Sequence, residues 1–244
     1  LALLAAAHLT GEQGWLEDAG RLADTLAERA EDDGTGLWWP AGDRQPLGYL
    51  HGSSGVGTFL TELGTRTDAP HLCRLGRRAL AFDLAQGRER PNGGLGFGAY
   101  AEAPAFEPYV VRGGAGVGMA VARQLAATDE PRLAATLRRI VRGVGMPFAV
   151  NPGYFSGMAG IAEFLLDCRD VLPDEPAVEE TLTRLVDQIM TLRCPGPDGT
   201  AFPGDGLLRQ SCDLASGSAG IALTLRRLAD GSGTLDLRYG RGAR

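Results

Sequence analysis

A six-residue pattern, G-x-[SA]-G-[VI]-[GA], occurs four times in this chain and constrains its fold more than any other feature. The copies begin at Gly52, Gly113, Gly157 and Gly217. Glycine makes up 36 of the 244 residues, roughly twice the average usage, and the pattern shows that many of these glycines hold defined positions. A motif that recurs at intervals of several tens of residues indicates an architecture built from one repeated unit.

The residues after each motif are apolar at helical spacing. Counted from the second glycine, positions +1, +5 and +8 are apolar in all cases but one: Val56, Leu60 and Leu63; Val117, Val121 and Gln124; Ile161, Leu165 and Cys168; Ile221, Leu225 and Leu228. A spacing of four and then three residues places these side chains on one helix face. Each motif is therefore predicted to be a tight turn that begins a helix.

A second kind of helix is expected between the motifs, with an apolar stripe and a charged opposite face. The apolar stripes of these helices extend over Leu16–Ala30, Leu72–Phe82, Leu133–Ile140 and Val178–Ile189. Small-residue helices that alternate with amphipathic ones favour an all-α fold, an α/α toroid with an inner and an outer ring of helices. No run of alternating strand residues is found, and loops 33–49, 86–110 and 194–213 are expected at one rim beside the motifs.

The charge balance excludes several classes of function. All 24 basic residues are arginine, so Schiff-base chemistry and a P-loop lysine are absent. The net charge of −6 argues against nucleic acid or an anionic membrane as a partner, and no apolar run is long enough to span a membrane. The four cysteines form no CxxC pair, which is typical of reduced thiols in the cytoplasm.

All four motif regions resemble parts of the lanthionine synthetase C-like cyclases. Residues 48–55 resemble the histidine-glycine element of that family, the Gly113 and Gly157 motifs fall at its two zinc-binding repeats, and residues 211–220 resemble the last repeat of the class III branch. The family domain is an α/α toroid of seven repeats. The resemblance implies that residues 1–230 are the C-terminal portion of such a cyclase domain, and residues 231–244 are expected to form a flexible tail.

The chain departs from the zinc-dependent members at the ligand positions. Those members carry a cysteine where this chain has Val111, and a Cys-His pair where it has Phe155 and Ser156. None of these side chains binds zinc, which requires thiolate, imidazole or carboxylate. We therefore expect no metal and no other cofactor, and the loss of zinc ligands is itself characteristic of the class III branch.

The resemblance implies a reaction and a set of partners. The expected reaction is the addition of a peptide cysteine thiol to a dehydroalanine or dehydrobutyrine of the same peptide, which forms a lanthionine or labionin thioether ring. The expected partners are a dehydrated lanthipeptide precursor, and kinase and lyase domains on the same or a partner polypeptide.

Four residues are candidates for the site. His51 matches the histidine of the family element and is the expected acid and base, because histidine titrates near neutral pH; its alternative role is structural. Arg112 is a candidate to hold a thiolate or enolate, and a salt bridge is its alternative. Tyr154 is a candidate to bind substrate. Asp213 could orient His51 or bind substrate, or instead cap a helix or brace its loop.

Two other functions stay open. The chain could be a non-catalytic toroid that holds the precursor peptide while the rings close elsewhere. It could also be a glycoside hydrolase, which needs two carboxylates facing one cleft. The acidic residues of the rim loops do not exclude this by residue type, although no pair forms a recognisable motif: Asp43, Glu102, Glu107, Asp205 and Asp213.

Overall fold

The structure, a computed structural model, describes residues 1–128, 130–146, 149–197 and 199–230. Helices dominate this part of the chain, so the all-α prediction is confirmed. The predicted tail, residues 231–244, lies outside the described residues.

Four helices begin directly after the first glycine of a motif, as the repeat predicts. They are α3 (Ser53–Arg66), α5 (Gly114–Thr128), α7 (Met158–Val171) and α9 (Ser218–Asp230). Their small residues allow close packing, and α5 and α7 are buried along most of their length. These are the inner helices of the fold.

The predicted amphipathic helices lie between the inner ones. They are α2 (Gly14–Glu28), α4 (Pro70–Ala85), α6 (Pro131–Val144) and α8 (Pro176–Thr191). Three of them begin with proline, a residue suited to the first helical position because its missing N–H would have no intrahelical acceptor there. Each packs against the inner helix next to it in the chain, and a further helix, α1 (Ala2–Thr10), packs against α2.

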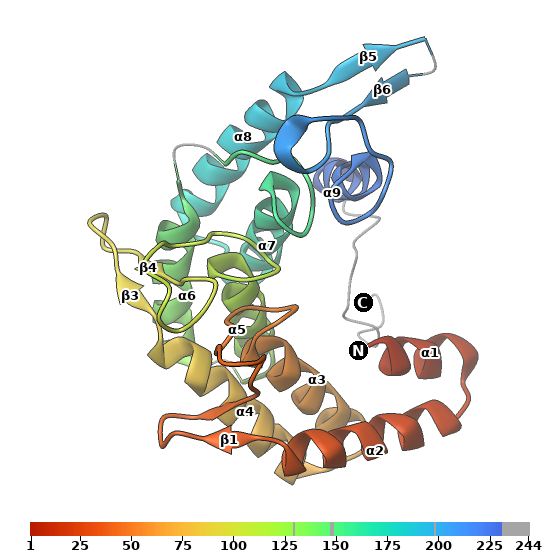
Figure 1. Ribbon diagram of the computed structural model, residues 1–244, viewed down its shortest axis with the longest axis vertical. Coiled ribbons are helices and arrows are strands. Elements are labelled where there is room, and N and C mark those ends of the chain that lie inside the picture. The colour runs from red at the N-terminus through yellow and green to blue at the C-terminus, as the bar shows by residue number, and fades with distance from the viewer. Residues whose placement is uncertain (129, 147–148, 198, 231–244) are drawn as a thin grey trace.

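The inner helices contact one another in series, α3 with α5, α5 with α7, and α7 with α9. Figure 1 shows the resulting curved layer, with the outer helices on its convex side and α1 and α9 at the two ends of an opening. The alternation of inner and outer helices is confirmed. The described helices form an open arc and not a closed ring, which is the shape expected of an incomplete toroid.

Short strands occur where none is expected from the sequence. Three two-stranded antiparallel hairpins lie in the loops that lead from an outer helix to the next motif: β1 (Glu31–Asp32) with β2 (Leu37–Trp38), β3 (Arg88–Glu89) with β4 (Leu95–Gly96), and β5 (Cys194–Gly196) with β6 (Gly199–Ala201). A strand of two or three residues is too short to show an alternating pattern. A 3₁₀ turn, η1 (Asp205–Leu207), lies in the last of these loops.

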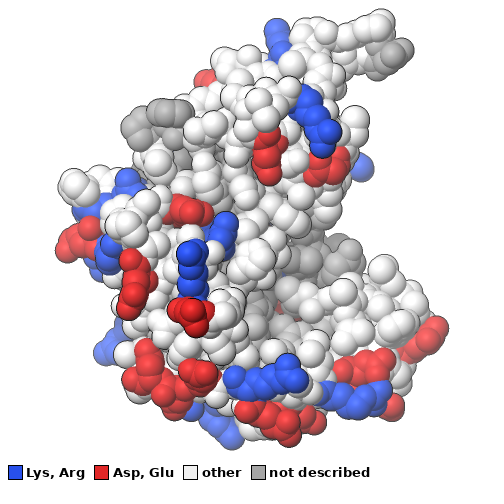
Figure 2. All heavy atoms as spheres, in the orientation of Figure 1, with Lys and Arg blue, Asp and Glu red and all other residues white. Residues whose placement is uncertain are grey.

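The apolar core follows the arc. One cluster joins α5 to α8 and takes in Ile221 of α9, and a smaller one joins α1 and α2 to α3. On the face shown in Figure 2, side chains of both signs are interspersed and no large area has one sign. No helix in the described ranges is long and apolar enough to cross a membrane.

Candidate functional site

The segments that precede the four motifs lie next to one another and form one rim. Three backbone hydrogen bonds join them in series: Leu50 N–H to Val111 O (3.2 Å), Val111 N–H to Phe155 O (3.0 Å), and Phe155 N–H to Ala215 O (2.9 Å). All four residues stand two positions before the first glycine of their motif. We call this series the rim ladder; it places equivalent positions of successive repeats side by side.

The second glycine of each motif is needed because the chain folds back on it. A Cβ atom at Gly55, Gly116, Gly160 or Gly220 would overlap the carbonyl oxygen of the residue six positions earlier. Such an approach is closer than real Cβ atoms show, so any larger residue would displace the turn. The glycines therefore fix the distance between each rim segment and its helix.

His51 lies in the turn before α3, at the rim, and its side chain is exposed. The neighbouring segment is close, since a Cβ on Gly48 would meet the backbone of Arg112. Among the described residues the His51 imidazole has no hydrogen-bond partner. The structure thus places the expected acid and base on the rim and shows no side chain that orients it.

A buried carboxylate holds the His51 turn, and no sequence motif indicates it. Asp83 of α4 is fully buried, and its Oδ2 accepts hydrogen bonds from Gly48 N–H (3.1 Å), Ser54 N–H (2.9 Å) and Ser54 Oγ (2.6 Å). These contacts lie three residues before and three residues after His51. Burial raises the Asp83 pKa to about 6, and the hydrogen bonds from Ser54 and Gly48 oppose that rise.

Arg112 holds the position in its rim segment that His51 holds in the first. It is half-buried, and its Nη1 donates a hydrogen bond to the Tyr100 hydroxyl (2.7 Å). The guanidinium also lies over the Tyr100 ring, 5.5 Å from its centroid, a distance that suits a cation–π contact. Neither Arg112 contact is the carboxylate salt bridge considered as an alternative.

The Tyr154 side chain points away from solvent. Its backbone belongs to the rim, but the side chain is only 4% exposed. Burial, with the nearby Glu163 and Asp167 carboxylates, raises the Tyr154 pKa well above its usual range. Tyr154 is therefore a neutral phenol directed toward the inner helices.

Asp213 braces its own loop. Its carboxylate accepts hydrogen bonds from the Ser211 hydroxyl, from Ser216 N–H (2.7 Å) and from Ser216 Oγ (2.9 Å). These hydrogen bonds hold the Asp213 pKa well below its usual range. The described contacts of Asp213 are those of a loop brace and do not include His51.

The rim ladder brings together Val111, Phe155 and Ser156, the three positions at which the resemblance implies zinc ligands in the zinc-dependent members. Val111 donates its N–H to Phe155 O, and Ser156 follows directly. Their isopropyl, benzyl and hydroxymethyl side chains do not fit a zinc ion. Within the ranges that the structure describes, no group of three or more His, Cys, Asp and Glu residues could hold a metal.

The inner helices also carry a charged residue at one fixed position of the repeat, which lies outside the six-residue motif. Seven residues after the second glycine, the four repeats carry residues of alternating sign: Glu62, Arg123, Asp167 and Arg227. Arg227 of α9 is buried and pairs with Asp167 (2.8 Å) and Glu163 of α7. Burial of Glu163 raises its pKa, against the opposing effect of Arg227.

Comparison with known proteins finds a similar protein in Streptomyces coelicolor. Over 184 residues, 75% of this chain, the sequence is 31% identical to a protein of Streptomyces coelicolor named probable SapB synthase. The similarity covers most of this chain. The chain spans only 19% of that protein's length, and no family model matches the chain.

Proposed function

We propose that the chain is a cyclase-type domain of a class III lanthionine synthetase, which forms thioether rings in a dehydrated peptide without zinc. The rim ladder is the observation that carries this proposal, because it sets the His51 turn and the substituted zinc positions side by side. The similarity to a protein named probable SapB synthase supports the proposal, since a synthase is an enzyme that forms a product.

The reaction needs a thiolate as the nucleophile and a proton donor for the α-carbon. A cysteine thiol has a pKa of about 8.5, so only a few per cent is ionised at neutral pH. In the proposed mechanism the His51 imidazole takes the thiol proton, and the thiolate adds to the β-carbon of the dehydroalanine. The displaced π electrons form an enolate, and the imidazolium returns the proton to the α-carbon. Arg112, in the adjacent rim segment, is the candidate to hold the enolate oxygen.

One observation favours a second candidate function, a scaffold that binds the peptide without catalysing ring closure. His51 is exposed and has no orienting partner among the described residues, whereas catalytic histidines are usually held by a carboxylate or carbonyl. In this alternative the rim only retains the precursor, and ring closure proceeds spontaneously or on other domains.

The substitution His51→Ala separates the two functions. The complete polypeptide that contains this chain is given a dehydrated precursor peptide with one free cysteine, and loss of the free thiol is followed with time. We expect ring closure to slow by roughly 100-fold, as for the loss of a general acid and base, while peptide affinity is retained.

The matched control is His71→Ala, which removes an exposed histidine from α4, away from the motifs. It should leave the rate of thiol loss unchanged. An unchanged rate in His51→Ala, with the peptide still bound, would support the scaffold and contradict the catalytic role of His51.

A further inference from the structure

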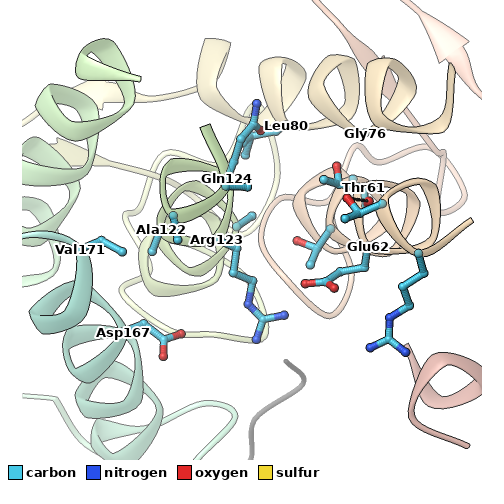
Figure 3. Close-up of a pocket in the computed structure, with 16 residues that line it drawn as sticks. Thr61, Glu62, Gly76, Leu80, Ala122, Arg123, Gln124, Asp167 and Val171 are labelled. Carbon is cyan, nitrogen blue, oxygen red and sulfur yellow. Dashed lines mark hydrogen bonds between the residues drawn. The ribbon is translucent and has the colours of Figure 1, made fainter. Parts of the chain in front are cut away.

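A pocket of about 170 Å³ opens between α3, α5 and α7, with α4 at its base. That volume is several times the ~30 Å³ that one water molecule occupies in the liquid. Its walls combine small residues with hydroxyl groups, among them Gly57, Gly76, Ala120, Thr58 and Thr61. Figure 3 shows Glu62, Arg123 and Asp167 directed toward the same side of this pocket, from three successive inner helices.

Arg123 is the residue of the pocket that is best suited to bind a ligand. Its Nη1 donates a hydrogen bond to the Tyr49 hydroxyl (2.6 Å), and the guanidinium lies 5.3 Å from the centroid of the Tyr49 ring. Its Nε is buried and has no hydrogen-bond acceptor among the residues that the structure describes. In the described part of the chain, no carboxylate lies within ion-pair distance of Arg123. A guanidinium that is fixed in this way and has no described carboxylate partner suits a carboxylate ligand.

The two acidic residues of the pocket differ from Arg123 in their surroundings. Asp167 already has a cationic partner, Arg227, at 2.8 Å. Glu62 is half-exposed on α3. Arg227, which Glu163 shares, thus compensates part of the negative charge of Asp167. The charge of Glu62, by contrast, would weaken the binding of an anion at Arg123.

The pocket is connected to the rim through Tyr49. Tyr49 stands two residues before His51, and its side chain is buried beneath the turn. Burial raises the Tyr49 pKa to about 12 despite the nearby Arg123, so the phenol is neutral. A side chain that enters the pocket would therefore meet a guanidinium that is hydrogen-bonded to the turn carrying the proposed acid and base.

We propose that this pocket binds the carboxylate of an acidic side chain of the peptide substrate, with Arg123 as the binding residue. The choice of a peptide as the ligand rests on the proposed function. The choice of a carboxylate rests on Arg123, its Tyr49 contact and the small residues that leave room beside it.

The test compares three peptides on the full chain. The first is an N-acetylated, C-amidated heptapeptide of six alanines with a central glutamate, and the second has glutamine in its place. The third keeps the glutamine but has a free C-terminal carboxylate. Binding is followed by NMR titration of the protein signals. The glutamate peptide should bind about tenfold more tightly than the glutamine peptide, the effect of a charge-assisted pair.

Variants identify the residue responsible. Arg123→Gln should bring the affinity ratio of the first two peptides close to one, and Glu62→Gln should raise the affinity of the glutamate peptide a few-fold. Arg66→Gln is the matched control, because Arg66 lines the same pocket but donates its Nη1 hydrogen bond to Leu4 O. It should leave the ratio unchanged.

Equal binding of all three peptides to the unaltered protein would overturn the proposal, and this comparison needs no variant to fold. Preference for the free C-terminal carboxylate alone would assign the pocket to a chain end and would also contradict it. A ratio that persists in Arg123→Gln would show that another group binds the carboxylate. Because no ring is formed in this assay, its result is independent of the thiol-loss experiment.

Discussion

Asp83 shows how one buried side chain can determine the geometry of an exposed site. Its Oδ2 accepts three hydrogen bonds from the two ends of the His51 turn, while its Oδ1 is buried and has no partner in the described ranges. A carboxylate in this environment loses more hydration than three hydrogen bonds restore, which explains its raised pKa of about 6. The turn and the titration of Asp83 are therefore linked.

This linkage predicts a pH dependence of stability. The Asp83 pKa is about 6 in the folded protein and about 3.9 in an unfolded chain, so the folded state binds the proton more readily between these values. The stabilising contribution is complete below pH 4 and is lost as the pH rises through 6. Compared with Asp83→Asn, the unaltered protein should gain about 2 kcal/mol of unfolding free energy between pH 7.5 and 4.5.

Urea unfolding at the two pH values measures this difference. The matched control is Asp187→Asn, which makes the same change at an exposed carboxylate of α8. An equal pH response in Asp83→Asn and in the unaltered protein would mean that Asp83 does not titrate in this range.

At the same scale, the sequence predicts some site residues better than others. His51 and Arg112 are found from local motifs, and both lie on the rim as neighbours of the first two motifs. Asp83 could not be found in this way, because its partners are 29 and 35 residues earlier in the chain and only folding brings them together. Arg123 carries a signal, its position in the repeat, but its contact with Tyr49 depends on tertiary packing.

At the scale of the elements, the glycine-opened helix is the unit that makes the rim. Each second glycine lies against a backbone carbonyl of its own rim segment, so the turn and the helix cannot move apart independently. A glycine in the middle of an exposed helix, by contrast, has room for a side chain. Gly20, inside α2, has no atom within 4 Å of the place where a Cβ would lie.

The same substitution should therefore have opposite effects at the two sites. Gly160→Ala is expected to lower the unfolding free energy by about 1–3 kcal/mol, because the methyl group overlaps Tyr154 O. Gly20→Ala should raise it by about 0.5–1 kcal/mol through its higher helix propensity. Thermal or urea unfolding of both variants measures the two effects. A Gly160→Ala variant as stable as the unaltered protein would contradict the close approach.

The helices could be predicted because the sequence patterns that define them are local. An apolar stripe of period 3.6 and a motif at the first turn define both kinds of helix within about 15 residues. The hairpins were missed because two paired residues on each side carry no periodicity. Trp38 illustrates this: it lies in β2 and stacks on Phe82 of α4, with ring centroids 5.9 Å apart, so its packing depends on a distant element.

At the scale of the whole molecule, the arc of helices and the rim ladder both result from the same sequence repeat. Successive inner helices pack side by side, and their rim segments are joined at equivalent positions, so a residue in one repeat has a defined neighbour in the next. The alternation of helices follows from the sequence. The helix pattern alone favours a closed toroid, and only the resemblance, which implies the C-terminal portion of a seven-repeat domain, predicts an incomplete one.

The rim ladder places equivalent positions of successive repeats side by side, and a metal site introduced at these positions tests this arrangement most directly. In the triple variant Val111→Cys, Phe155→Cys and Ser156→His, the ladder should hold two thiolates and an imidazole close enough to bind zinc, with water as a fourth ligand. We predict one zinc ion per chain by elemental analysis, and none above background in Val111→Cys alone. A triple variant that folds but retains no more zinc than the single variant would contradict the account.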